Sequence, residues 1–249
     1  MKIYSKELNE KKFDELVIAA STGKYKEISK EVIKKEIIKQ LRNNPALINK
    51  LEKKKHFQDL VKSVKTNLHK GIGVFTKAKG LDHLSTKDRD YSIYKKIFEL
   101  TKKPKKIVDL GSGLNPQSYK QLECNPEYIA YEINQEQVKE INKFFEKNKI
   151  NGKAYCKDVL EIKKFPIADI YFLLKLVDSL ELGRGHKITE NLIKDLPTKN
   201  LVISFSTKTL AGNPMNFPKR GWMDLMLERL DINFEYIETE SELFYIINK

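Results

Sequence analysis

Cysteine is scarce in this 249-residue sequence, and long apolar runs are missing. The two cysteines, Cys124 and Cys156, have no Cys-x-x-Cys spacing and no accompanying histidine pattern, which argues against a metal site and favours two reduced thiols. No apolar stretch approaches the roughly 20 residues that cross a bilayer, and the first residues are charged, unlike the apolar run of a signal peptide. We therefore expect a cytoplasmic protein with no metal and no membrane partner.

Acidic residues are outnumbered by basic ones, 34 to 47, and most of this deficit lies in the first third of the chain. Residues 1–79 hold 20 Lys/Arg against 9 Asp/Glu, a net charge of +11, whereas residues 80–249 carry a net charge of only +2. Such asymmetry indicates a basic module that binds a polyanion, of which nucleic acid is the foremost candidate. Two alternatives remain open, a lysine-rich surface that only solvates its own helices and an amphipathic membrane-surface helix.

Apolar residues recur at helical spacing from Asn9 to about Thr76, which predicts a small bundle of about three to five helices. After a glycine-containing linker, short apolar runs and amphipathic segments alternate, as they do in a parallel α/β sheet. We therefore expect a basic helical domain over residues 1–79 and an α/β domain over residues 80–249.

Two common nucleotide-binding signatures are missing. The sequence has no Gly-Lys-Ser/Thr phosphate loop, and Pro116 stands where a dinucleotide fingerprint needs its third glycine. What is present is a buried-strand pattern, Ile107–Leu110, that runs into the turn Gly111–Gly113. A helix is predicted after the turn, with Asn115 as its N-cap and Pro116 at its first position. This Asp-x-Gly-x-Gly pattern fits the turn that binds S-adenosylmethionine, and a structural turn without a ligand is the alternative.

Polar residues stand at the ends of the predicted strands that follow. Glu132 ends the second strand, 21 positions after Gly111, where an acid can accept hydrogen bonds from ribose hydroxyls. Asp158 follows the third strand, in position to accept a hydrogen bond from an adenine amino group, or else to act as a loop or cap aspartate. Lys175 closes a nearly continuous apolar strand and is either a solvent-reaching strand end or a site residue. Residues 233–238 and 243–247 predict a closing antiparallel hairpin.

A convincing pair of histidine and carboxylate for general-base catalysis is absent, which fits a reaction that removes no proton.

Arg89 lies in an octapeptide, residues 83–90, that is either a helix start or a binding segment. Its planar guanidinium suits the carboxylate of a bound amino-acid-like group.

The segments His83–Arg89 and Gly111–Pro116 together resemble the aminoglycoside-resistance 16S ribosomal RNA guanine-N7 methyltransferases. That family has a His-x-Ser-Thr-Arg/Lys-Glu-Arg motif and a Gly-Cys-Gly-Leu-Asn-Pro turn. Four further segments look similar, so that the resemblance covers roughly residues 24–249: Lys65–His69, Phe172–Leu176, Ser204–Leu210 and Glu240–Ile247.

The resemblance implies a class I S-adenosylmethionine-dependent methyltransferase fold. This is a Rossmann-like, mostly parallel seven-stranded sheet with an antiparallel last strand, preceded by a small all-helical domain that docks on the 30S ribosomal subunit. The implied activity is methyl transfer to N7 of a guanine in 16S ribosomal RNA by a monomer, with S-adenosylmethionine as cofactor. The implied cofactor-binding residues are His83, Leu84, Ser85, Arg89, Gly111, Gly113, Glu132, Asp158, Val159 and Leu174. Lys175 would lie beside the methyl group and Lys208 near the target nucleotide.

The sequence departs from the family pattern in three places. Ser112 replaces a cysteine or alanine, Asp88 replaces a glutamate, and the loop Gly212–Gly221 does not match. The loop leaves the modified nucleotide, and with it antibiotic resistance, unassigned. Two other functions stay open: a methyltransferase of tRNA, a small molecule or a protein, and a non-catalytic RNA-binding assembly factor.

Overall fold

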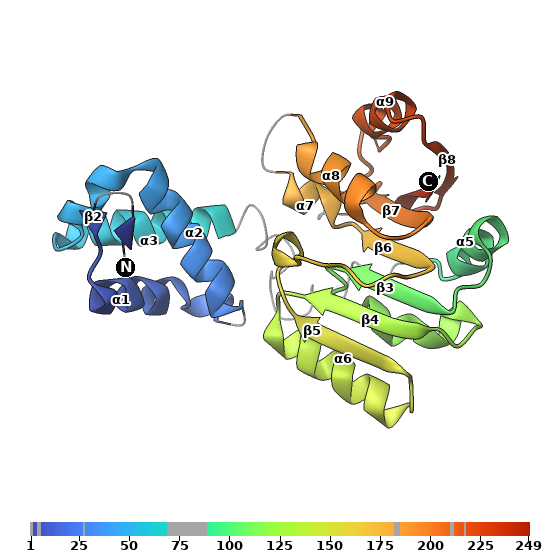
Figure 1. Cartoon of the computed structure of the whole chain (residues 1–249), viewed down its shortest axis with the longest axis horizontal. Helices are drawn as coiled ribbons and strands as arrows, with labels where there is room; N and C mark the ends of the chain where they lie inside the picture. Colours follow the sequence, from blue (N-terminus) through green and yellow to red (C-terminus); the bar gives the residue numbers. More distant parts are fainter. Residues whose placement is uncertain are drawn as a thin grey trace. The chain divides into compact units, whose positions relative to one another are not determined.

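A computed structural model describes residues 2–3, 6–26, 28–68, 89–181, 185–209, 212–216 and 218–249 (Figure 1). The chain divides into two compact units, of which the first is Met1–Asp82 with Ile133–Gln135 and the second is the remainder. Both this division and the domain boundary predicted at residues 79/80 fall within residues 69–88, outside the described part of the chain. No described helix is both long enough and apolar enough to cross a membrane.

The first unit is built on three α-helices that share one apolar core. These are α1 (Glu10–Ala20), α2 (Lys30–Asn43) and α3 (Lys54–Leu68), connected by η1 (Gly23–Tyr25) and η2 (Pro45–Lys50). Asn9 and Ser29 cap α1 and α2 by accepting a hydrogen bond from a backbone N–H of the first turn. The expected apolar stripe is buried, with Leu16, Ile33 and Val64 fully inside. The helical prediction is therefore confirmed for residues 10–68.

One correction concerns the start of this unit. Two short strands, β1 (Lys2–Ile3) and β2 (Lys6–Glu7), pair antiparallel before α1. The resemblance implied an all-helical unit, and this strand pair departs from that expectation. A two-residue strand pair is too short to show an alternating apolar pattern, and it could not be predicted from the sequence for this reason.

The second unit contains a seven-stranded sheet in the order β5-β4-β3-β6-β7-β9-β8. Strands β5 to β7 are mutually parallel, and β9 runs antiparallel to both of its neighbours, which confirms the predicted architecture. The bounds are β3 Lys106–Leu110, β4 Glu127–Glu132, β5 Gly152–Cys156, β6 Ile170–Leu174, β7 Asn200–Ser206, β8 Asn233–Glu238 and β9 Glu242–Asn248.

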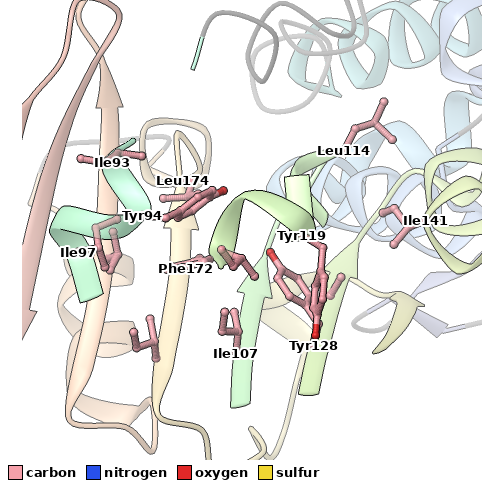
Figure 2. Close-up of a cluster of buried hydrophobic side chains, with 14 of the residues drawn as sticks. Ile93, Tyr94, Ile97, Ile107, Leu114, Tyr119, Tyr128, Ile141, Phe172 and Leu174 are labelled. Atoms are coloured by element: carbon pink, nitrogen blue, oxygen red, sulfur yellow. The ribbon is translucent and has the colours of Figure 1, made fainter. Parts of the chain in front are cut away.

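Helices cover both faces of this sheet because its central strands alternate buried side chains between two apolar clusters. Figure 2 shows the first cluster, in which Phe172 and Leu174 of β6 belong with side chains of α5, η4 and α6. Tyr171 and Leu173 of the same strand belong to the second cluster, with side chains of η5, α7, α8 and α9. The bounds are α5 Ile93–Thr101, η4 Asn115–Leu122, α6 Gln135–Lys147, η5 Val159–Glu161, α7 Val177–Leu180, α8 Lys187–Asp195 and α9 Gly221–Arg229.

Candidate functional site

The chain reverses its direction across the sheet at β3, since β4 and β5 lie on one side of this strand and β6 and β7 on the other. Ligands of open α/β sheets bind at such a switch point, outside the carboxyl ends of the strands. The predicted site residues follow these five ends in order across the sheet: Asp158 after β5, Glu132 on β4, Gly111 and Gly113 after β3, Lys175 after β6, and Lys208 after β7.

The two glycines of the turn after β3 have different surroundings. Both have a left-handed backbone, with φ of +61° at Gly111 and +50° at Gly113. A Cβ atom on Gly111 would lie 2.4 Å from Cδ1 of Leu176, whereas one on Gly113 would meet no atom of the described residues within 4 Å. Gly111 therefore allows close packing between the β3 turn and the segment after β6. Gly113 leaves its backbone open to an approaching ligand.

Glu132 is attached directly to this turn. Its carboxylate is buried and accepts a hydrogen bond from the Gly113 N–H at 2.9 Å, and its carbonyl accepts one from the Lys157 N–H at 2.9 Å. The acid at the end of β4 is thus fixed beside the glycine turn.

Asp158 and Val159 stand at the start of η5. One carboxylate oxygen of Asp158 accepts a hydrogen bond from the Leu160 N–H at 2.9 Å, so this aspartate is a helix cap. Its side chain is only half-buried, while Val159 is 5% exposed. Asp158 can cap η5 and also accept a hydrogen bond from adenine, because one carboxylate oxygen accepts from the Leu160 N–H and the carboxylate has a second oxygen.

Arg89 is buried, and the structure gives its guanidinium protein partners. Nε and Nη2 donate to the two carboxylate oxygens of Glu242 at 3.0 and 2.9 Å, and Nη1 donates to Oδ1 of Asn115. Its expected contact with a ligand carboxylate stays a prediction. The other members of that segment, His83, Leu84 and Ser85, lie outside the described residues.

Asn115 does not cap the segment that it begins, which corrects the sequence prediction. The capping position is taken by Leu114, and the helix that follows is a 3-10 helix. The Asn115 side chain is drawn instead into a buried polar network, where Oδ1 accepts from Tyr94 at 2.8 Å and Nδ2 donates to Asp109 at 2.8 Å. These buried partners outweigh the local preference of asparagine for a cap.

Asp109 lies at the centre of this network, below the glycine turn. Its Oδ2 accepts from Asn115 and, at 2.7 Å, from the Tyr128 hydroxyl, while Oδ1 has no hydrogen-bond partner in the described part of the chain. Burial raises the pKa of Asp109 to about 6, although hydrogen bonds from Asn115 and Tyr128 act in the opposite direction.

The two lysines expected near the reacting groups are both paired with acids. Nζ of Lys175 lies 3.4 Å from Oε2 of Glu242, and Nζ of Lys208 lies 2.5 Å from Oε1 of Glu240. Leu174, the remaining predicted residue, is 9% exposed and belongs to the first apolar cluster (Figure 2).

Glu242 is the residue that sequence reasoning missed. It has no exposed surface, yet it is the first residue of a strand whose next five side chains are all buried. An acid directly before an apolar run was the available signal, because a buried carboxylate requires a partner.

The helical unit has a separate hollow of about 740 Å³ between α1, η1 and α3. Its apolar lining comes from Ala19, Tyr25, Phe57 and Val61, and its polar lining from Lys54, Gln58, Lys62, Lys65 and Thr66. We call it the α3 groove. It combines ring surfaces with lysines and has no acid among these lining residues, which suits a phosphate-bearing chain.

The family model for ribosomal RNA methyltransferase (FmrO) matches residues 23–243. The chain is 26% identical over 181 residues to a 16S rRNA (guanine(1405)-N(7))-methyltransferase of Proteus mirabilis, covering 67% of this chain and 63% of that protein. It therefore spans less than two thirds of that relative. The 16S rRNA methylase RmtB has a TM-score of 0.72 and 19% identity, with 98% of this chain and 100% of that chain covered. RmtF in complex with S-adenosyl-L-homocysteine has a TM-score of 0.69 and 17% identity, with 98% and 100% covered. These two likenesses concern the fold.

The two glycines predict different costs for the same substitution. Gly113→Ala should lower the free energy of unfolding by about 1–2 kcal/mol, the cost of a left-handed backbone at a residue with a Cβ atom. Gly111→Ala should lower it by about 1 kcal/mol more, the low end of an overpacking cost, because its methyl group must displace the end of the flexible Leu176 side chain. Urea unfolding of the two variants measures the difference, and equal losses would contradict the packing role of Gly111.

Asp109→Asn should change the pH dependence of stability. An aspartate with a pKa of about 6 in the folded protein and 3.8 in the unfolded chain binds its proton more tightly when folded. The buried charge therefore costs nothing below about pH 4 and up to about 3 kcal/mol above pH 6. The stability of the variant relative to the unchanged protein should rise between pH 4 and 6 and then level off. Thermal unfolding at several pH values measures this, and a constant difference would show that Asp109 titrates normally.

Proposed function

The chain belongs to the ribosomal RNA methyltransferase (FmrO) family, and on this premise we propose that it transfers a methyl group from S-adenosylmethionine to N7 of a guanine in 16S ribosomal RNA. The observation that carries the proposal is the row of residues along the carboxyl ends of β5, β4, β3, β6 and β7, since it joins a nucleoside-binding half to a lysine-bearing half. We further propose that the enzyme acts as a monomer on the 30S subunit, in the cytoplasm.

The residues on the β4 side of the switch point fit the cofactor. The Glu132 carboxylate, held by the Gly113 N–H, would accept hydrogen bonds from the ribose hydroxyls. Asp158 and Val159 would bind the adenine, one by a polar contact and one by an apolar contact. Among the described residues no atom would crowd a Cβ position at Gly113, so its backbone would allow close approach. Gly111, Leu174 and Arg89 with His83, Leu84 and Ser85 would surround the methionine end.

The reaction requires little of the protein beyond positioning the guanine and the methyl donor. The bound cofactor supplies a methyl group on a positively charged sulfur. N7 of guanine presents a lone pair on its major-groove edge, so no base has to remove a proton. Lys175 and Lys208, at the ends of β6 and β7, would orient the guanine after it leaves its stack, which costs a few kcal/mol. Correct placement of the two reactants can contribute about 7–11 kcal/mol toward the barrier.

The helical unit would hold the RNA backbone. Its lysines are flexible point charges, which suit phosphates rather than base edges. The α3 groove adds Tyr25 and Phe57 to three of these lysines, and this gives a bound strand apolar surface as well as charge.

Methyl transfer can be tested with labelled S-adenosylmethionine and 30S subunits. Label should appear in 16S RNA, and mass mapping should place it on one guanine as 7-methylguanosine. Glu132→Ala should lose cofactor binding and labelling together, because it removes the ribose acceptor. Incorporation into tRNA but not into 30S subunits would favour the alternative substrate class. Absence of cofactor binding by the unchanged protein would favour an assembly factor.

Docking by the α3 groove predicts a graded effect of salt. Lys54→Gln and Lys62→Gln should each weaken 30S binding and reduce the slope of log K against log salt by about one, since each removes one phosphate contact. The matched control is Lys39→Gln on α2, which is exposed but does not line the groove. Calorimetry should give an unchanged cofactor affinity for all three. Equal weakening by the control would assign binding to overall charge rather than to the groove.

A further inference from the structure

The Glu242 carboxylate, on β9, contacts side chains from three other chain segments. It accepts two hydrogen bonds from Arg89, which precedes α5, and a third from the Ser204 hydroxyl on β7. It also lies 3.4 Å from Nζ of Lys175, at the end of β6. The carboxylate is fully buried, while the Lys175 side chain is 13% exposed. Lys175 is therefore the member of this cluster with an opening toward solvent.

Lys175 is held at its backbone as well as at its side chain. Its N–H donates to both the carbonyl and the hydroxyl of Ser204, each at 3.0 Å. Its φ is +54°, a left-handed conformation that lysine rarely adopts and that persists only where its surroundings determine it. Ser204 and Glu242 thus fix both ends of one residue. A lysine that only reached for solvent would need neither constraint.

We propose that Glu242 is a positioning residue for methyl transfer, acting through Lys175. This inference rests on the proposed function. The major-groove edge of guanine carries two acceptors, N7 and O6. An ammonium that donated to N7 would occupy the lone pair that must attack the methyl group. In the proposed complex, the Lys175 ammonium restrained by Glu242 would donate to O6 rather than to N7. It would then orient the guanine without occupying the lone pair that attacks the methyl group.

A second consequence concerns charge. In the transfer, the bond between N7 and the methyl carbon forms while the carbon–sulfur bond breaks, and sulfur keeps the electron pair. The positive charge thereby moves from sulfur to the guanine ring. An unpaired ammonium beside that ring would oppose the reaction by like-charge repulsion. Glu242 reduces this repulsion, because its negative carboxylate is paired with the Lys175 ammonium.

A purely structural role for Glu242 predicts different behaviour. Glu242 also pairs with Arg89, so its loss alone would lower stability and activity for either reason. The two explanations separate in a double-mutant cycle. If Glu242 acts through Lys175, its substitution should have little further effect on kcat once Lys175 is gone. If it acts only by supporting the fold, the effects of the two substitutions should multiply.

The experiment compares Glu242→Gln, Lys175→Met and the double variant by single-turnover methylation of 30S subunits. Glu242→Gln should lower the rate about 100-fold in the unchanged background, as misplacement by about 1 Å can do, and less than about threefold in the Lys175→Met background. Ser204→Ala, a smaller change that keeps every charge, tests the same point if Glu242→Gln does not fold. Its rate loss should also vanish without Lys175.

Two controls decide the outcome. Lys208→Met is the matched control, because Lys208 pairs with Glu240 and not with Glu242, so its effect should multiply with that of Glu242→Gln.

Crystal structures of the unchanged protein and of Ser204→Ala, each with S-adenosylhomocysteine, are a control that does not depend on measuring activity. They should show Nζ of Lys175 displaced in the variant. Multiplicative losses with Lys175→Met, or an unmoved Nζ, would overturn the proposal. Absence of methylation by the unchanged protein would instead overturn the proposed function.

Discussion

The buried ion pair between Arg89 and Glu242 is the interaction on which the second unit depends most. The two residues are 153 positions apart, and both side chains are almost fully removed from solvent. Such a pair holds together only when both members and their additional hydrogen bonds are in place, since loss of one partner leaves a buried charge and costs about 3–5 kcal/mol. The segment before α5, which carries Arg89, and the last strand β9, which carries Glu242, therefore each need the other to be folded in place. The candidate site at the carboxyl ends of the strands therefore depends on β9, which lies between β7 and β8 and carries Glu242.

From Arg89 the same network continues to the glycine turn. Asn115 links the guanidinium to Asp109, and Asp109 lies two residues before the turn Gly111–Gly113, in which the Gly113 N–H donates to Glu132. The turn is thus anchored from below by polar contacts and from the side by the packing of Gly111 against Leu176. A site whose task is positioning benefits from this rigidity, because errors of about 1 Å between reactants can cost two orders of magnitude in rate.

The sequence predicted the strands, their ends and the glycine turn, because each has a local signature. Apolar alternation, a strand-end acid at Glu132 and paired glycines are all readable within a few residues. It did not predict the partners of Arg89 or the role of Glu242, because their pairing depends on where β9 enters the sheet. Asn115 was misassigned for the same reason. Its local preference is a cap, but its neighbours in space are Tyr94 and Asp109, which the order of the chain does not reveal.

The uneven distribution of charge along the chain follows from the proposed reaction. RNA binding needs many cations, but the reacting sulfur and then the methylated guanine are themselves cationic, and a strongly positive site would repel both. Lysines in excess are found in residues 1–79, with a net charge of +11, whereas residues 80–249 carry +2. Within the second unit the same compensation is seen at single residues, since Lys175 is paired with Glu242 and Lys208 with Glu240. Cations that would hold the RNA backbone and cations that would act at the candidate site are thus under different constraints, which fits the concentration of excess positive charge in residues 1–79.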